Sequence, residues 1–233
     1  MIGKVRILKG IVLLLMASLT FSTLNVNALS VETSTTYTVT NTNSTGAGSL
    51  WQAIADANAN PGKDTINFAI PKIDIGYSPL DDVWIIGLTG VLPTLLEPSG
   101  VVIDGRTQYT SNPNLPAIII QGTGTIPLGA DLLTIISNHN EVYNLGFFDS
   151  QGDGIVIDGE SNIIEGNQIF TSPGYGVNLV AGANYNTIVR NQICGHSLGG
   201  IKLQLAYTNM IEENLIGIRP SHLSMVPETA VME

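Results

Sequence analysis

The chain has 233 residues, with 19 acidic and 9 basic side chains and a formal net charge of −10 at pH 7. This balance argues against binding to nucleic acid or anionic lipid through charge, and we expect no nucleic-acid partner. Gly accounts for 25 residues and only 12% of the residues are charged, so the length fits one turn-rich β domain with a small cap. An acidic surface permits calcium binding, although it also simply favours solubility.

Residues 1–28 have the pattern of a secretory signal peptide. Its basic start contains Lys4, Arg6 and Lys9. The apolar run covers residues 11–21, and the small-residue cleavage site covers residues 26–28. A run of about eleven residues is too short to cross a bilayer, which takes about twenty. We therefore expect a secreted or cell-surface protein with no membrane span after signal cleavage; an uncleaved anchor is the alternative.

Residues 29–70 are predicted to form an N-terminal cap in the order strand, helix, strand. The strands are expected at 37–40 and 64–68, which are rich in Thr, Ile and aromatic residues. Between them Ser49 can cap a helix, with Gln52 three residues later as its partner in a capping box. The apolar residues that follow at helical spacing are Leu50, Ala53, Ile54 and Ala57.

The stretch from 71 to 121 is irregular. Short apolar runs predict strands at 83–88, 101–104 and 117–121, but their register relative to one another cannot be assigned from spacing. Residues 109–116 contain two prolines and several polar turn formers, which predicts a loop that leaves the regular structure.

A repeat of 22 to 24 residues organises the chain from residue 132 onward. Each strong copy of one phrase begins with Asn and carries Ile two residues on, Asn five on and Ile seven on; the copies are 162–169, 186–193 and 209–216, with a weaker one from Asn140. A second phrase keeps step with it at 132–135, 154–157, 176–179 and 200–203. A period of this length is typical of a solenoid.

The repeated segments predict strands, because they are short, rich in Ile and Val, and alternate with a period of two. At about 3.3 Å per residue, one repeat makes a coil of three short strands and three bends, and successive coils stack as parallel strands about 4.8 Å apart. The sequence therefore predicts an all-β fold, a parallel β-helix (β-solenoid) with coils over 71–217 and a short N-terminal capping helix. That helix would cover the hydrophobic end that stacking leaves open.

Stacking at this period places Asn167, Asn191 and Asn214 directly above one another. A stacked amide can donate to one neighbour and accept from the other, which predicts a ladder of hydrogen bonds along the column. The alternative is that Asn simply tolerates the geometry of a bend. Either interpretation makes these residues structural.

The segment 48–68 (Gly-Ser-Leu-Trp-Gln-Ala-Ile, then Ala-Asn-Ala-Asn and Asp-Thr-Ile-Asn-Phe) resembles the N-terminal segment of the CSLREA-type family of secreted right-handed β-helix proteins. Trp51 stands where that family has Arg. The resemblance continues at 92–94, 101–105, 116–120 and 214–217, so it covers most of the chain after residue 28. It implies a right-handed parallel β-helix, export and a surface or extracellular role, and it brings no catalytic motif.

Two aspartates are the strongest candidates for chemistry. In the predicted register Asp131 and Asp153 occupy one column of adjacent coils, with Tyr175 and Gly199 above them. Two carboxylates about 5 Å apart repel each other, so the pair shares a proton, binds a cation or separates into water. This makes Asp131, Asp153 and Asp158 candidates for acid and base at a sugar linkage, and Asp131 with Asp153 a candidate calcium site. The plain alternative is that they are turn residues in water. We expect no cofactor other than that calcium.

Other features weaken an enzymatic interpretation. A lyase resembling the pectate lyases needs a basic residue facing the acids, and neither Arg190 nor Lys202 is well placed for this in the predicted register. The fragment 194–196 (Cys-Gly-His) matches only part of a polygalacturonase motif, so we interpret His196 as a bend residue and Cys194 as a small buried side chain. The remaining histidines have no partners at zinc-ligand spacing.

A binding role is the remaining interpretation. The predicted outward column Thr134, Val156, Asn178 and Lys202 is mixed in character, and Tyr175 and Asn178 are its best candidates for contact with sugar. We therefore predict an exported, non-catalytic β-helix surface or scaffold protein that binds an extracellular polysaccharide or cell-wall component. The alternative is a carbohydrate-active enzyme, a polysaccharide lyase or glycoside hydrolase. A third interpretation is that the irregular tail, 218–233, marks a truncated chain whose active part lies in further coils.

Overall fold

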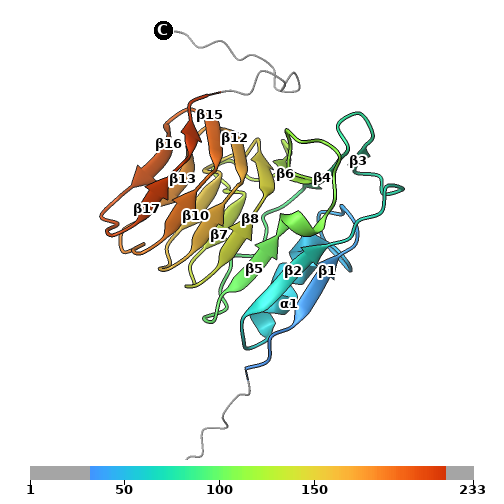
Figure 1. Cartoon of the computed structure of the whole chain (residues 1–233), viewed down its shortest axis with the longest axis horizontal. Coiled ribbons are helices and arrows are strands. Elements are labelled where there is room, and N and C mark those ends of the chain that lie inside the picture. The colour runs from blue at the N-terminus through green and yellow to red at the C-terminus, as the bar shows by residue number, and fades with distance from the viewer. Residues whose placement is uncertain (1–31, 219–233) are drawn as a thin grey trace, which may run out of the picture. The chain divides into compact units, whose positions relative to one another are not determined.

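The computed structural model describes residues 32–218, which excludes the predicted signal peptide and all but the first residue of the predicted tail. Within this part the chain forms one α-helix, one 3-10 turn and eighteen strands (Figure 1). In chain order these are β1 (Thr36–Val39), α1 (Leu50–Ala59), β2 (Asp64–Phe68), β3 (Tyr77–Ser78), β4 (Val83–Leu88), β5 (Val101–Asp104), η1 (Gly105–Thr107), β6 (Ile118–Gly122), β7 (Leu133–Ile135), β8 (Glu141–Tyr143), β9 (Leu145–Phe148), β10 (Ile155–Ile157), β11 (Ile163–Glu165), β12 (Gln168–Ser172), β13 (Tyr175–Leu179), β14 (Thr187–Val189), β15 (Gln192–His196), β16 (Gly199–Leu203), β17 (Met210–Glu212) and β18 (Leu215–Ile216).

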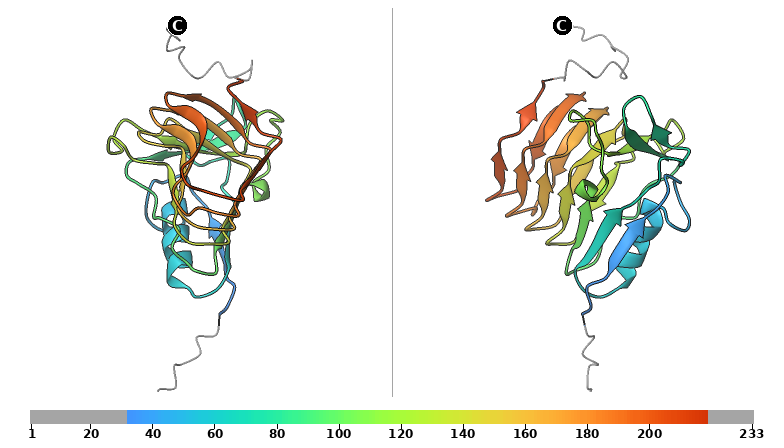
Figure 2. Two further views of the ribbon diagram at one scale, coloured as in Figure 1. Left: turned by 90° about the vertical axis from the view of Figure 1, so that its left-hand side faces the viewer. Right: turned by 45° about the vertical axis from the view of Figure 1, so that its right-hand side comes forward.

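The strands form three sheets in which neighbours in space lie one coil apart in sequence (Figure 2). Sheet A has the order β1-β2-β5-β8-β11-β14-β17, sheet B the order β18-β15-β12-β9-β6-β4-β3, and sheet C the order β16-β13-β10-β7. From β7 onward each coil passes once through sheets C, A and B, and the pairing between coils is parallel. The exception is the short hairpin of β3 with β4. The fold is therefore a parallel β-helix.

The register agrees with the predicted repeat. In sheet C, Ile155 pairs with Leu133 on one side and with Val177 on the other, and Val177 pairs with Ile201. Side chains at these positions point into one continuous hydrophobic core that also contains the inward residues of sheets A and B. The predicted strands at 83–88 and 101–104 are confirmed as β4 and β5, and the strand predicted at 117–121 begins one residue later.

The N-terminal end of the stack carries β1, α1 and β2. Both strands extend sheet A, and α1 packs against them with Leu50, Ala53, Ile54 and Ala57 buried in the core. Ser49 caps the helix as predicted, since the Gln52 backbone N–H donates to its Oγ at 3.2 Å. The predicted capping box is wrong in its second half. The Gln52 side chain donates to Asp56 Oδ1, four residues along, instead of reaching back to Ser49.

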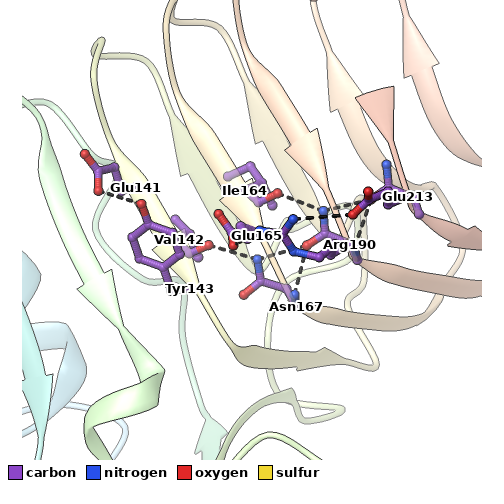
Figure 3. Close-up of polar contacts among 10 residues, drawn as sticks. Glu141, Val142, Tyr143, Ile164, Glu165, Asn167, Arg190 and Glu213 are labelled. Carbon is purple, nitrogen blue, oxygen red and sulfur yellow. Dashed lines mark hydrogen bonds and ion pairs between the residues drawn. The ribbon is translucent and has the colours of Figure 1, made fainter. Parts of the chain in front are cut away.

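A column of asparagines lies at the bend from sheet A to sheet B. Asn191 Oδ1 accepts from the backbone N–H of Asn167 at 2.9 Å and from its Nδ2 at 3.1 Å, while Asn191 Nδ2 donates to the Ile164 carbonyl at 2.8 Å. Asn214 repeats the pattern against Asn191. Figure 3 shows Asn167 directed at the Val142 carbonyl in the same way. The column is the ladder that the spacing predicts, and backbone groups take part in it as well as amides.

A second column, not singled out from the sequence, lies at the bend from sheet C to sheet A. It consists of Asn140, Asn162, Asn186 and Asn209. Asn162, Asn186 and Asn209 each accept the backbone N–H of the preceding member at 2.7 to 2.8 Å, and Asn140 accepts that of Val101 at 2.8 Å. These four residues begin the copies of the repeated phrase, so the same sequence pattern carries both columns.

The residue before each asparagine has a left-handed backbone. Arg190 (φ 55°) and Glu213 (φ 55°) precede the first column, and Ser161 (φ 58°) and Tyr185 (φ 59°) precede members of the second. For a residue with a side chain this conformation costs about 1–2 kcal/mol. The hydrogen bonds of the asparagine that follows therefore hold the chain in a left-handed turn that the preceding residue would otherwise disfavour.

A column of glycines marks the start of sheet C, at 154, 176 and 200. None has a positive φ, so the requirement here is for space. A Cβ on Gly176 would overlap Ile193 Cγ2 and lie 2.7 Å from the Gly200 carbonyl oxygen and 2.8 Å from His196 Nε2. Gly154 and Gly200 face isoleucines of sheet B in the same way. The glycines let the two sheets meet closely at this corner.

We expect Asn191→Ala to lower the free energy of unfolding by about 2–4 kcal/mol, because it leaves the buried Asn167 N–H and Ile164 C=O without partners. Urea unfolding followed by circular dichroism measures the change. The control is Gln192→Ala, whose side chain makes only a long exposed bond at 3.4 Å. A loss below about 1 kcal/mol for Asn191→Ala would show that the column does not stabilise the stack.

We expect Gly176→Ala to destabilise the protein by about 1–3 kcal/mol, since the added methyl group has no space between the two sheets. Gly124→Ala is the matched control, because nothing lies within 4 Å of its added Cβ and its φ is not positive. Thermal unfolding of both variants tests the difference. Equal melting temperatures would contradict the assignment of this column to close packing.

Candidate functional site

The outward face of sheet A is occupied by charged side chains that pair with one another. Tyr143 lies between them: its hydroxyl donates to Glu141 Oε2 at 2.7 Å, and the Arg106 guanidinium lies 3.8 Å from its ring centroid (Figure 3 shows the first contact). Burial and the neighbouring Glu141 carboxylate raise the pKa of Tyr143 to about 12. Lys63 and Asp104 complete the group by pairing with Glu141 at 2.6 Å and with Arg106 at 2.7 Å.

A second charged group continues across the later coils of sheet A. Arg190 lies between Glu165 of the coil before and Glu213 of the coil after, and it pairs with both (Figure 3). These carboxylates raise the pKa of Arg190 further above its ordinary value. The sequence predicts that Arg190 does not face the aspartates of sheet C. The structure agrees, because the Arg190 guanidinium is ion-paired with the carboxylates of sheet A. Sheet A therefore presents few free polar groups to a ligand.

Sheet B is covered on the outside. Phe148, Phe170 and Cys194 point outward from it yet are buried, with the two phenyl rings 5.1 Å apart. The segment 108–117, here called the cover loop, crosses this face: its Leu115 packs on the cluster and the Asn114 carbonyl accepts from Gln168 Nε2 at 2.6 Å. The prediction that Cys194 is a buried side chain is confirmed, and the predicted loop over 109–116 lies on the sheet.

Asp82 holds the cover loop to the segment before β4. Its carboxylate accepts from Lys72 Nζ at 2.6 Å, from the Tyr77 hydroxyl at 2.7 Å, and from both the N–H and the hydroxyl of Ser111. The Lys72 ammonium and the Ser111 donors hold the pKa of Asp82 far below its usual range. This carboxylate stays ionised at any physiological pH, which gives it an anchoring role.

Sheet C brings Asp131, Asp153, Tyr175 and Asn178 together. The Asp153 N–H donates to Asp131 Oδ1 at 2.7 Å, and the Tyr175 N–H donates to Asp153 Oδ1 at 2.6 Å. Asn178 Nδ2 donates to Asp153 Oδ2 at 2.7 Å. Each carboxylate thus accepts a backbone N–H from the next coil, and Asp153 uses its second oxygen to orient an amide. Burial, with the Asp153 charge adding to it, raises the pKa of Asp131.

Tyr175, Asn178 and Lys202 form the polar part of this face. The Lys202 ammonium lies 5.1 Å from the Tyr175 ring centroid. Within residues 32–218 the other four basic side chains are ion-paired, and Lys202 is the one with no carboxylate partner. Asn178 Oδ1 is buried and accepts no hydrogen bond from the described residues. The face therefore combines an aromatic ring and an ammonium group without a carboxylate partner, beside an amide whose oxygen is buried.

The third predicted aspartate, Asp158, does not join this group. It follows the last residue of β10, is exposed, and its register position is five residues from Asp153, about 16 Å along an extended chain. Asp131 and Asp153 have no third partner for a metal: the described part of the chain contains no group of three or more His, Cys, Asp and Glu side chains that could hold an ion. The calcium site and the catalytic roles of all three aspartates stay predictions.

His196 lies beside the same face, and its contacts could not be read from the sequence. Its Nε2 lies 2.9 Å from the Ile169 carbonyl oxygen, which can only accept, so Nε2 carries a proton. Its Nδ1 lies 2.6 Å from Ser172 Oγ. Burial lowers the pKa of His196, and the Asp153 charge acts in the opposite direction. The imidazole is thus held by strand β12 at two atoms. His196 is the last residue of strand β15, so the interpretation of it as a bend residue is wrong.

Comparison with known proteins agrees with the architecture. A family model described as a right handed beta helix region matches residues 132–221. No curated protein and no solved structure matches the chain. The fold is a right-handed parallel β-helix with a short helix at its N-terminal end. None of the helical segments in residues 32–218 is long and apolar enough to cross a membrane.

We expect Asp131→Asn to stabilise the protein at pH 7 by up to about 1 kcal/mol after solvent screening. Since folding raises the pKa of Asp131 above its ordinary value of 3.8, its contribution to stability is greatest below pH 4 and is lost as the pH rises. The amide keeps an oxygen for the Asp153 N–H and removes the charge. Melting temperatures at pH 3 and pH 7 should therefore separate only at pH 7. The exposed Asp158→Asn controls for the change in net charge, and equal behaviour of the two variants would contradict the assignment.

Proposed function

We propose that this is an exported, non-catalytic protein of the CSLREA type that binds an extracellular polysaccharide or cell-wall component on sheet C. The observation that carries the proposal is the hydrogen bonding of Asp153, whose two oxygens hold the Tyr175 backbone and the Asn178 side chain. Those are the two residues best suited to contact sugar. The Asp153 carboxylate thereby orients both residues of the proposed binding face, and both of its oxygens already accept hydrogen bonds.

The chemistry of the face suits a polysaccharide. The Tyr175 ring offers an apolar surface against which the C–H groups of a sugar ring can pack. Lys202 has donors that no carboxylate among the described residues uses. The parallel coils repeat at about 4.8 Å, so equivalent positions form a straight and rigid track for an extended polymer.

The occupied carboxylates argue against catalysis at the same place. A general acid or base must reach the proton that it transfers, and both oxygens of Asp153 and one of Asp131 already accept N–H groups. Lys202, the basic residue that a lyase would use, lies against the Tyr175 ring. The alternative, a polysaccharide lyase or glycoside hydrolase, is favoured by the raised pKa of Asp131, which is what a general acid needs.

We expect Tyr175→Ala to weaken polysaccharide binding about 3- to 10-fold, the equivalent of roughly 0.5–1.5 kcal/mol for an aromatic contact. Affinity electrophoresis of the full chain through gels containing polygalacturonate, xylan, a soluble β-glucan or glycol chitin measures it. The control is Tyr207→Ala, which removes a more exposed ring (63%) from the last coil, whereas Tyr175 is only partly exposed. If no member of the panel retards the protein, or if both variants weaken binding equally, the proposed face is wrong.

The same panel distinguishes the enzymatic alternative. Release of reducing ends or of unsaturated uronate products is assayed with and without calcium. The proposed function expects none. Product formation that Asp153→Asn abolishes would replace the binding role by catalysis.

A further inference from the structure

The hydrogen bonds around His196 determine its tautomer. Because Nε2 must donate to the Ile169 carbonyl, the neutral ring has a bare Nδ1, and the Ser172 hydroxyl donates to it across 2.6 Å. Ser172 is 3% exposed, and its oxygen also lies 3.2 Å from the Tyr175 carbonyl oxygen. One hydroxyl proton cannot serve both acceptors, so the neutral imidazole takes it and the Tyr175 carbonyl does not.

Protonation of His196 reverses this arrangement without moving a heavy atom out of hydrogen-bond range. The imidazolium carries a proton on Nδ1 and donates it to Ser172 Oγ, which can then only accept from the ring. The hydroxyl proton turns to the Tyr175 carbonyl, which already accepts the Gly154 N–H at 2.8 Å. The charge state of His196 is thereby transmitted through one hydroxyl group to the backbone of Tyr175.

The ring of His196 packs against uncharged groups and lies near one carboxylate. β12 contributes Ser172 and Ile169 and β13 contributes Gly176, none of which is charged. Among the described residues the charged group that acts on the ring is Asp153, which precedes β10 and holds the Tyr175 N–H. The Tyr175 N–H is therefore fixed by Asp153, and the Tyr175 C=O is the group that the Ser172 hydroxyl can reach.

We propose that His196 is a pH-responsive positioning residue of the sheet C face, which switches the Ser172 hydrogen bond between its own ring and the Tyr175 carbonyl. This inference rests on the proposed function only for its biological consequence, which is that an acid medium weakens polysaccharide binding at Tyr175 and Asn178. The switch itself is a property of the protein alone. At most one proton is involved, so affinity falls by no more than tenfold per pH unit.

The range of the switch follows from burial. A buried imidazole is harder to protonate, so the pKa of His196 lies below its ordinary value of 6.5. Above its ordinary pKa of 6.5 the imidazole is neutral in both the folded and the unfolded protein. The stability that the neutral ring contributes is lost as the pH falls through the lower pKa of the folded state. The protein is thus in its binding form at neutral pH and leaves it in acid.

Nuclear magnetic resonance of the full chain without ligand tests the switch. Between pH 7.5 and pH 4.5, the backbone amide of Tyr175 and the ring of His196 should titrate with one midpoint. Ser172→Ala should leave the His196 titration in place and remove the response of Tyr175. His196→Asn, which keeps an acceptor near the Nδ1 position, should remove the response of the Tyr175 amide.

Two results would overturn the inference. One is a Tyr175 amide that does not follow His196 in the unmodified chain. The other is a response that survives in Ser172→Ala, which would mean that the hydroxyl does not carry it. Failure of every polysaccharide to bind would remove the proposed function and leave this titration unaffected, so the two failures are distinguishable.

Discussion

The structure depends on a hydrogen bond that crosses from one coil to the next at every bend. Where the backbone leaves a sheet it loses its ladder partners, and a buried N–H without a partner costs about 1–3 kcal/mol. Here a side-chain oxygen of the neighbouring coil accepts that N–H, as Asn191 does for Asn167 and Asn186 for Asn162. The bends also contain left-handed residues such as Arg190, so the same bond offsets backbone strain. The coil can turn within 22 to 24 residues because each turn is completed by the next.

The candidate site uses this device with carboxylates. Asp131 and Asp153 accept backbone N–H groups from the next coil just as the asparagines do, although the direction along the stack is reversed. An ionised oxygen makes a stronger acceptor than an amide, and Asp153 has a second oxygen that orients Asn178. The face that carries Tyr175, Asn178 and Lys202 is thus built from structural hydrogen bonds. Ion pairs occupy sheet A and the cover loop covers sheet B, which leaves sheet C as the open face.

Much of this arrangement could be predicted from the residues. The parts that could not be predicted depend on which partner a side chain reaches. The period of Asn and Ile predicts the coil length, the stacking of Asn167 on Asn191, and the common column of Asp131 and Asp153, because register in a stacked coil is set by spacing alone. The capping box failed because Gln52 has a competing partner, Asp56, on its own helix. The contacts of Lys202 with Tyr175 and of His196 with Ser172 join positions 24 or more residues apart through side-chain rotamers. The period of the repeat gives the position of a residue in its coil, but it does not give the rotamer of its side chain.

The sequence by itself therefore determined the architecture: a parallel β-helix, its three strands per coil, its capping helix and the residues that stack at one bend. It could do so because hydrophobic alternation and repeat length act locally and are written in the order of the residues. Only the tertiary structure decided which face is free. That outcome depends on where the irregular segment 71–121 lies and on which charged side chains pair across coils. Both are settled by packing in three dimensions, where Lys202 finds no carboxylate partner among the described residues and Arg190 finds two.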